Sequence, residues 1–230
     1  MSTFTALVLT APPPGHTGES SGAMAKVDGR ESVLRCVELF LNRDNIKQIL
    51  LAISPESEEE IKRKFGGALG FMGIKLVIGG KKWGEQIAAA VPKIAAESSH
   101  ILVHDASRPV VPYADIDALL ESAERHAAVA LVAPLRGALV ELDEGGGAMA
   151  LHQPTAFVQL LTPQAVSRAR LVEWGGGRDI HPTEWTLLKG SALNIRLNGA
   201  GDAALAKAML GLLPKPKSKA PSNPFEEAQW

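Results

Sequence analysis

Short apolar runs separated by amphipathic stretches constrain the fold of this chain more than any other feature of its sequence. The runs cover residues 6–9, 48–53, 75–78, 100–103, 129–133, 157–161 and 193–197. Several are apolar almost throughout, as expected for parallel strands that are covered on both faces. Between them, residues 31–42, 83–96 and 115–125 carry apolar side chains at helical spacing. This alternation predicts an α/β fold with an open, mostly parallel sheet, which binds ligands at the carboxyl ends of its strands.

Two segments depart from this alternation. Residues 139–142 and 148–151 flank the sequence DEGGG and predict a β-hairpin, which either serves association or forms a solvated flap. Residues 214–230 are rich in Pro, Lys and Ser and predict a disordered tail. The tail ends in Phe225 and Trp230, so a docking peptide is the alternative to a spare end. We therefore expect one α/β domain over residues 1–213.

Composition excludes several classes of function. The net charge is −1, so no overall field draws the chain to nucleic acid or to an anionic membrane. Cys36 is the single cysteine, which rules out an internal disulfide and favours a small buried hydrophobic residue. The first residues do not resemble a signal peptide, and no run reaches the roughly 18 apolar residues that span a bilayer. A cytoplasmic location is the expectation.

The loop after the first run, residues 10–18, has the sequence TAPPPGHTG. Nucleotide phosphates usually lie at this point of an open sheet, held by backbone N–H groups of a glycine-rich loop. Three consecutive prolines remove such donors and fix φ. This loop is therefore a poor phosphate cradle.

Two later stretches carry candidate chemistry. Gly79 and Gly80 precede Lys81 and Lys82 at the start of a predicted helix, which suits either an anion site or a solvated turn. Residues 104–109, HDASRP, follow the fourth run. Asp105 could hold a divalent cation, and Arg108 could pair with a phosphate. The alternative is that the two residues form a salt bridge where the strand ends. The preceding histidine is expected to be an ordinary packed one.

Residues 103–109, VHDASRP, resemble the hallmark V-H-D-A-A-R-P of the 2-C-methyl-D-erythritol 4-phosphate cytidylyltransferases. Further pieces agree with the family in order and spacing. They are ISP at 53–55, GG at 79–80, APLR at 133–136, LTPQ at 161–164 and NIR at 194–196. The resemblance covers roughly residues 5–212.

The resemblance implies a Rossmann-like nucleotidyltransferase fold of the nucleotide-diphospho-sugar transferase type. It also implies a β-arm, about residues 136–156, that exchanges across a homodimer. The family transfers CMP from CTP to a sugar-alcohol phosphate in the non-mevalonate isoprenoid pathway, with the assistance of Mg²⁺. Such a transfer depends on positioning and on cations around the developing charge.

Some site residues carry over. Asp105 matches the acid that holds metal and substrate, Arg108 the motif arginine with a catalytic and acceptor-binding role, and Thr162 the acceptor-site threonine. Arg196 stands where the family usually has a catalytic lysine. The nucleotide-binding candidates are Ala11, Gly79, Gly80, Lys81 and Lys82.

Other family positions are changed. The first loop, A-A-G-x-G-x-R-M in the family, has His16 at its arginine, and a following lysine falls on Ala23. In the segment G-G-x-x-R-x-x-S, the arginine becomes Trp83 and the serine becomes Gln86. The arm arginine that reaches into the partner's site falls on Pro154.

These changes favour an impaired cytidylyltransferase that serves as a binding or partner protein, with an active paralogue as one partner. The alternative is an active nucleotidyltransferase with rearranged phosphate contacts or a different acceptor. In that case CTP or a related nucleotide would bind, and Lys26, Arg30, Lys81 or Lys82 would replace the missing cations. A purely structural scaffold is a weaker third reading.

Overall fold

The computed structural model describes residues 2–16 and 22–214, and the tail predicted from residue 214 lies outside them from residue 215 onward. The helices and strands follow the predicted alternation. The strands are β1 (Phe4–Leu9), β2 (Lys26–Val27), β3 (Arg30–Glu31), β4 (Ile46–Ile53), β5 (Lys75–Ile78), β6 (His100–Asp105), β7 (Ala128–Pro134), β8 (Leu139–Leu142), β9 (Ala148–His152), β10 (Val158–Ser167) and β11 (Thr186–Lys189). The α-helices are α1 (Ser32–Glu38), α2 (Glu58–Phe71), α3 (Trp83–Ala90), α4 (Tyr113–Ala123), α5 (Arg168–Gly175) and α6 (Ala203–Leu212).

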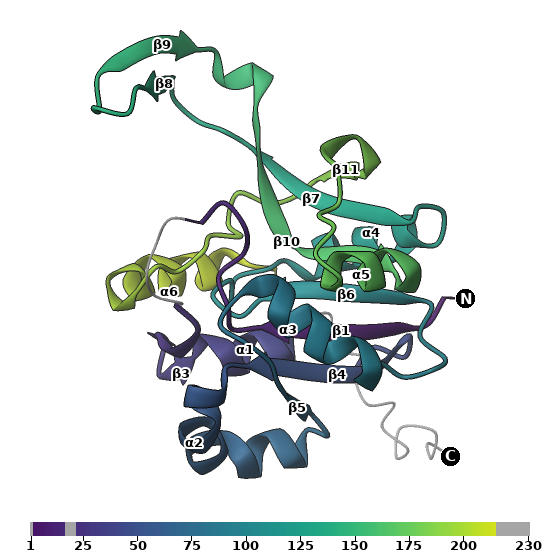
Figure 1. Ribbon diagram of the computed structural model, residues 1–230. Helices are drawn as coiled ribbons and strands as arrows, with labels where there is room; N and C mark the ends of the chain where they lie inside the picture. Colours follow the sequence, from purple (N-terminus) through teal and green to yellow (C-terminus); the bar gives the residue numbers. More distant parts are fainter. Residues whose placement is uncertain (1, 17–21, 215–230) are drawn as a thin grey trace, which may run out of the picture.

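A seven-stranded sheet in the order β11-β7-β10-β6-β1-β4-β5 forms the centre of the described chain (Figure 1). β1 pairs in parallel with β4 and β6, β4 with β5, and β7 with β11. β10 is antiparallel to both of its neighbours, β6 and β7. The prediction of a mostly parallel α/β sheet is therefore confirmed.

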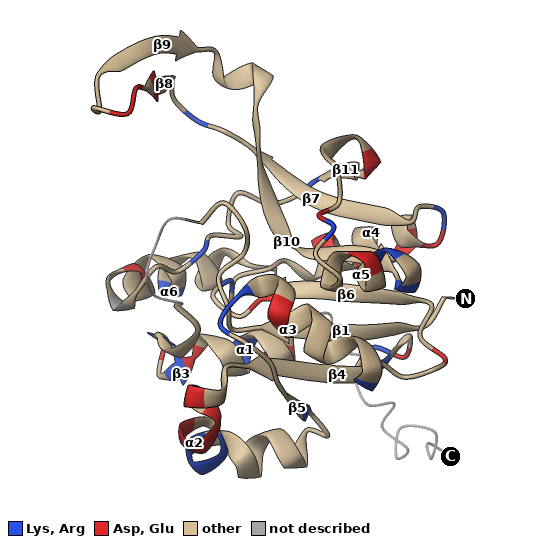
Figure 2. Cartoon of the chain, in the orientation of Figure 1, with Lys and Arg blue, Asp and Glu red and all other residues tan. Residues whose placement is uncertain are grey.

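Helices cover both faces of the sheet because the strand side chains alternate between them. In β1, Phe4, Ala6 and Val8 join the apolar cluster that contains residues of α1, α2 and α4. Leu7 and Leu9 join the opposite cluster, with residues of α3 and α5. Each large apolar side chain buried in this way contributes about 1.5–3 kcal/mol. The charged residues lie mainly on the outer helices and loops (Figure 2).

The expectation of a last strand at residues 193–197 is wrong. This segment has no regular structure, and β11 forms the edge of the sheet instead. Leu197 packs with Val27, Val110 and Ala206 of α6 in a separate buried cluster, and its backbone N–H donates to the carbonyl of Ser107. The apolar side chains of this run therefore seat α6 and do not extend the sheet.

β10 brings an additional polar side chain to the carboxyl end of β6. Its pairing with β7 is irregular between Leu160 and Gln164, which locally redirects the strand. Because β10 runs antiparallel to β6, with Gln164 opposite Val103, Thr162 comes to lie beside Asp105.

The predicted β-hairpin is formed by β8 and β9. It projects from the body of the molecule at the end of two long connections (Figure 1). Its apolar side chains Val140, Leu142, Met149 and Leu151 are all exposed. Within the described residues, no helix has the length and apolar character needed to cross a membrane.

Candidate functional site

The carboxylate of Asp105 lies buried at the carboxyl end of β6. Its Oδ1 accepts the backbone N–H of Ser107 at 2.8 Å, and its Oδ2 accepts Nε–H of Arg196 at 2.7 Å. Both side chains of this ion pair are withdrawn from water, since Asp105 is 0% and Arg196 6% exposed. Two residues that the sequence places far apart thus form the electrostatic centre of the site.

A chain of hydrogen bonds runs behind this ion pair. The backbone N–H of Asp105 donates to Oγ1 of Thr162 at 3.1 Å, so the hydroxyl proton is free to donate to Nδ1 of His104, also at 3.1 Å. Nε2 of His104 then donates to the carbonyl of Arg108 at 3.1 Å. Burial, followed by the charge of Arg108, lowers the pKa of His104 to about 3. His104 is therefore a neutral packed histidine, as predicted from the sequence.

Two arginines approach the site with unused donors. Nη1 of Arg108 donates to the carbonyl of Asn194 at 2.7 Å, and burial lowers the pKa of its guanidinium. Asn194 in turn donates its amide to the carbonyl of Thr162 at 2.7 Å. Among the residues that the structure describes, Nε of Arg108 and Nη2 of Arg196 are buried without a hydrogen-bond partner. Such donors are costly unless an acceptor completes them.

His16 comes from the loop after β1 and closes one side of the site. Nη1 of Arg196 donates to its Nε2 at 2.6 Å. Burial, and then the charge of Arg196, lower the pKa of His16. A neutral imidazole therefore stands where the family resemblance expects an arginine, and it accepts a hydrogen bond in place of offering a positive charge.

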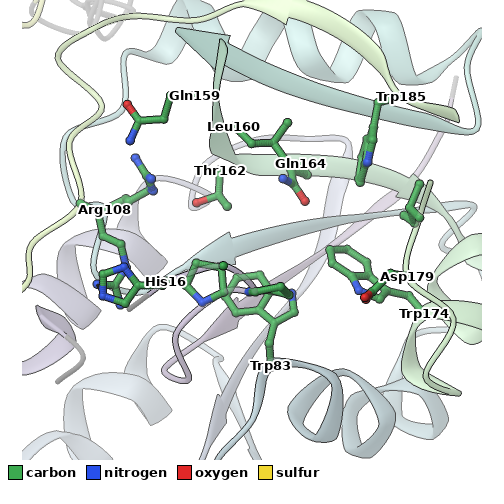
Figure 3. A pocket seen from close by; sticks show the side chains of 15 residues that line it. His16, Trp83, Arg108, Gln159, Leu160, Thr162, Gln164, Trp174, Asp179 and Trp185 are labelled. Carbon is green, nitrogen blue, oxygen red and sulfur yellow. Dashed lines mark hydrogen bonds between the residues drawn. The ribbon is translucent and has the colours of Figure 1, made fainter. Parts of the chain in front are cut away.

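A cavity of about 460 Å³ opens in front of these groups (Figure 3). It lies between the loop after β1, the start of β10, and the segments around α3, α5 and β11. Its lining includes His16, Trp83, Arg108, Gln159, Thr162, Gln164, Trp174, Asp179, Trp185 and Arg196. The tryptophans and Asn194 were not among the residues singled out from the sequence as site candidates. The tryptophans could have been noticed because the residue is rare in this chain, which has only four of them.

The predicted nucleotide-binding residues Ala11 and Gly80 lie beside the side chain of Gln86, which is 1% exposed. Oε1 of Gln86 accepts the backbone N–H groups of Thr10 and Ala11, each at 3.1 Å. Its Nε2 donates to the carbonyl of Gly80 at 3.1 Å and to Oγ1 of Thr10 at 3.3 Å. One carboxamide thus occupies polar backbone groups in the two segments that follow β1 and β5.

The two glycines are required here by close packing against α3. A Cβ atom at Gly79 would lie 2.8 Å from Cα of Gln86. A Cβ atom at Gly80 would lie 2.0 Å from Oε2 of Glu85, which itself accepts the backbone N–H of Lys82 at 3.1 Å. The helix therefore closes over the Gly-Gly turn, and the glycines need no ligand to explain them.

The other basic residues considered from the sequence do not line the cavity. Lys81 pairs with Glu56 at 2.9 Å, Lys26 pairs with Glu31 at 3.7 Å, and Arg30 pairs with Glu38. Lys82 is exposed at the start of α3. Ala23, at the position of a family lysine, is buried and brings no charge.

The side chains around Asp105 do not form a preformed magnesium site. Both carboxylate oxygens already accept hydrogen bonds, and the guanidinium of Arg196 takes the place that a cation would need. In the described part of the chain, no group of three His, Cys, Asp or Glu side chains could hold a metal ion. Mg²⁺ often binds through one or two carboxylates together with substrate phosphates, so Mg²⁺ at Asp105 stays a prediction that requires Arg196 to move.

Comparisons with known proteins agree with the geometry. Residues 16–176 match the family model of 2-C-methyl-D-erythritol 4-phosphate cytidylyltransferase (IspD). The cytidylyltransferase of Rhodopirellula baltica is 29% identical over 221 residues, which cover 84% of this chain and 88% of that protein.

Solved structures share the fold. The 4-diphosphocytidyl-2C-methyl-D-erythritol synthase of Anaerococcus prevotii has a TM-score of 0.73 at 17% identity, covering 91% of this chain and 99% of that chain. The 2-C-methyl-D-erythritol 4-phosphate cytidylyltransferase of Thermus thermophilus has a TM-score of 0.70 at 22% identity, covering 88% and 96%. The fold, the strand-end motif and the match over most of the chain establish that this protein belongs to the 2-C-methyl-D-erythritol 4-phosphate cytidylyltransferase family.

Proposed function

We propose that this chain is a ligand-binding member of its family in which cytidylyl transfer is impaired. The observation that carries the proposal is the position of Gln86. Its carboxamide binds the N–H of Ala11 and the carbonyl of Gly80, which by resemblance belong to the nucleotide site, and also accepts the N–H of the neighbouring Thr10. A pyrimidine base would have to expel a side chain that is already fully hydrogen-bonded.

Binding of CTP would be weakened at both the base and the phosphates. Each hydrogen bond of Gln86 contributes about 1 kcal/mol, and a base that replaces this side chain must first break four of them. The phosphates would also meet His16 and Ala23 in place of two cations. Loss of one charged donor to a transition state costs about 3 kcal/mol, roughly a hundredfold in rate.

The opposite end of the site keeps the means to hold an anion. Arg108, Arg196 and Thr162 line one cavity, so two guanidinium groups and a hydroxyl-bearing side chain border it. The proposed protein therefore still binds an anion at Arg108 and Arg196, but no longer binds the nucleotide that the transfer reaction requires. The chain's own residues would orient an anionic group beside Asp105 and exclude water from it.

The test is calorimetric titration of the wild-type protein and of Gln86→Ser with CTP and Mg²⁺. We expect no heat with the wild type at millimolar CTP, and an affinity at least about tenfold higher in Gln86→Ser, where the backbone groups become available. Gln153→Ser, at an exposed glutamine of the arm, is the matched control. Micromolar CTP binding by the wild type that disappears in Asp105→Asn would overturn the proposal.

A second candidate is an active nucleotidyltransferase with rearranged phosphate contacts. Arg108, Thr162 and Arg196 line one cavity, and the buried Asp105 is hydrogen-bonded to Thr162 and Arg196 behind it, which favours this candidate. Pyrophosphate release from CTP in the presence of methylerythritol phosphate is the assay. Turnover by the wild type that depends on Arg108 would establish this candidate in place of the first.

We also propose that the β8–β9 hairpin makes a homodimer. It holds a set of exposed apolar side chains away from the body of the chain; its acidic residues lie in β8 and at the turn, and β9 carries none (Figure 2). Exposed apolar groups of this kind are typical of association surfaces. Pairing with an active paralogue would use the same surface, and co-expression with such a chain distinguishes mixed from like pairs.

A further inference from the structure

The cavity in front of Asp105 has two chemically different ends (Figure 3). At one end lie Arg108, which is 5% exposed, and Arg196. Each keeps a buried N–H donor that has no partner among the described residues. At the other end lie the indole rings of Trp83, Trp174 and Trp185. The family resemblance assigns ligand contacts to Arg108 and Arg196 at the arginine end.

The indole rings form a continuous aromatic wall. The ring centroids of Trp83 and Trp174 are 6.4 Å apart with 48° between their planes. Those of Trp174 and Trp185 are 6.2 Å apart with 77° between planes, an edge-to-face contact. The three residues come from α3, α5 and the segment before β11, so only the fold brings them together.

Packing alone does not account for this wall. Trp83 and Trp174 belong to the apolar cluster beneath α3 and α5, but Trp185 is only partly buried at its margin. All three rings nevertheless line the cavity, and Nε1 of Trp83 is buried without an acceptor. Three residues that line this cavity, Trp83, Arg108 and Arg196, therefore each keep one buried side-chain nitrogen without a hydrogen-bond partner among the described residues.

We propose that this cavity binds a small organic anion that carries a flat unsaturated ring. The ring lies against the indoles, because aromatic groups prefer stacked or edge-to-face contacts with one another. The phosphate or carboxylate lies at Arg108 and Arg196, whose guanidinium N–H groups match oxyanions. The carboxylate of Asp179 lines the indole side and disfavours the reverse orientation. The volume of about 460 Å³ suits a ligand of this size.

This inference rests on the proposed function, because it names the ligand class of the same cavity. It differs from the family's sugar-alcohol acceptor in requiring a ring, which the indole wall recognises. A polyol phosphate would fill the arginine end and leave the wall in water.

The probe is phenyl phosphate, with cyclohexyl phosphate and inorganic phosphate as matched comparisons of the same charge type. Titrations are followed by calorimetry and by tryptophan emission in a Trp230→Phe background, in which the remaining three tryptophans all line the cavity. We expect phenyl phosphate to bind at least about tenfold more tightly than either comparison, since only it makes the aromatic contact.

Variants separate the two ends. Trp185→Leu changes the partly buried member of the wall, so the fold is expected to persist. It should weaken phenyl phosphate about tenfold and leave inorganic phosphate unchanged. Arg196→Lys keeps a charge beside Asp105 but loses the forked donors, and it should weaken both anions. Arg125→Gln, at an exposed arginine outside the cavity, is the control that should change neither.

Equal affinities for the phenyl and cyclohexyl compounds, or an unchanged affinity in Trp185→Leu, would overturn the inference. So would the absence of phenyl phosphate binding at millimolar concentration. That last result, together with no CTP binding, leaves the proposed loss of nucleotide binding intact. CTP binding by the wild type overturns the proposed function whatever phenyl phosphate does.

Discussion

Nε of Arg196 lies 2.7 Å from Oδ2 of Asp105, although the two residues are 91 positions apart in the chain. Both side chains are removed from water, so each charge depends on the other for its stability. Arg196→Met should therefore lower the free energy of unfolding by about 3–5 kcal/mol. Urea denaturation measures this change.

The double variant Asp105→Asn/Arg196→Met is the companion experiment. It removes both charges and should recover at least about 1 kcal/mol relative to the sum of the single changes. Strict additivity of the two single changes would show that the ion pair does not couple these residues.

Thr162 links the backbone of Asp105 to the ring of His104 through a single hydroxyl group. Thr162→Val keeps the shape of the side chain but leaves the buried N–H of Asp105 without an acceptor. The free energy of unfolding should fall by about 1–3 kcal/mol. Thr162→Ser retains the hydroxyl and should lose less than half as much in the same urea titration. Equal losses in both variants would assign the effect to packing of the methyl group.

His104 should make the stability of the fold depend on pH. Burial lowers its pKa to about 3 in the folded protein, whereas an unfolded histidine titrates near 6.5. Below pH 6.5 the unfolded chain therefore binds a proton that the folded chain refuses. This contribution to stability is complete above pH 6.5 and is lost as the pH falls toward 3, by about 1.4 kcal/mol per pH unit.

The check is urea unfolding of the wild type and of His104→Gln between pH 7.5 and pH 4.5. Burial also lowers the pKa values of His16 and His100, so both proteins lose stability on acidification. The wild type should have the steeper slope, and the difference between the two slopes is the part due to His104. Parallel slopes would mean that His104 is protonated in the folded protein or exposed to water.

The arm gives a prediction about assembly. Leu142 in β8 is exposed, and a charge there would be buried in the proposed dimer interface. Leu142→Lys should convert a dimer to a monomer in light scattering after size exclusion, with an unchanged circular dichroism spectrum. Leu212→Lys, at an exposed leucine of α6, is the matched control that should stay dimeric. A monomeric wild type at micromolar concentration would remove the dimer proposal.

The sequence by itself determined the class of fold and the position of Asp105 and Arg108. Apolar runs with helical stretches between them specify a parallel sheet, because the pattern reports which faces of each element are buried. Asp105 stands two positions after such a run, so its place at the carboxyl end of a strand could be predicted. The hairpin of β8 and β9 could also be predicted, since a glycine-rich turn between two short runs, all adjacent in the sequence, defines it.

Only the tertiary structure decided what these residues touch. That Arg196 neutralises Asp105, that Gln86 occupies the backbone of Ala11 and Gly80, and that three tryptophans form one wall are contacts between distant segments. The run at residues 193–197 was misassigned for the same reason, because packing against α6 and pairing in a sheet require the same apolar side chains. Periodicity identifies buried faces, but the partner of each buried polar group is fixed only when the elements pack together.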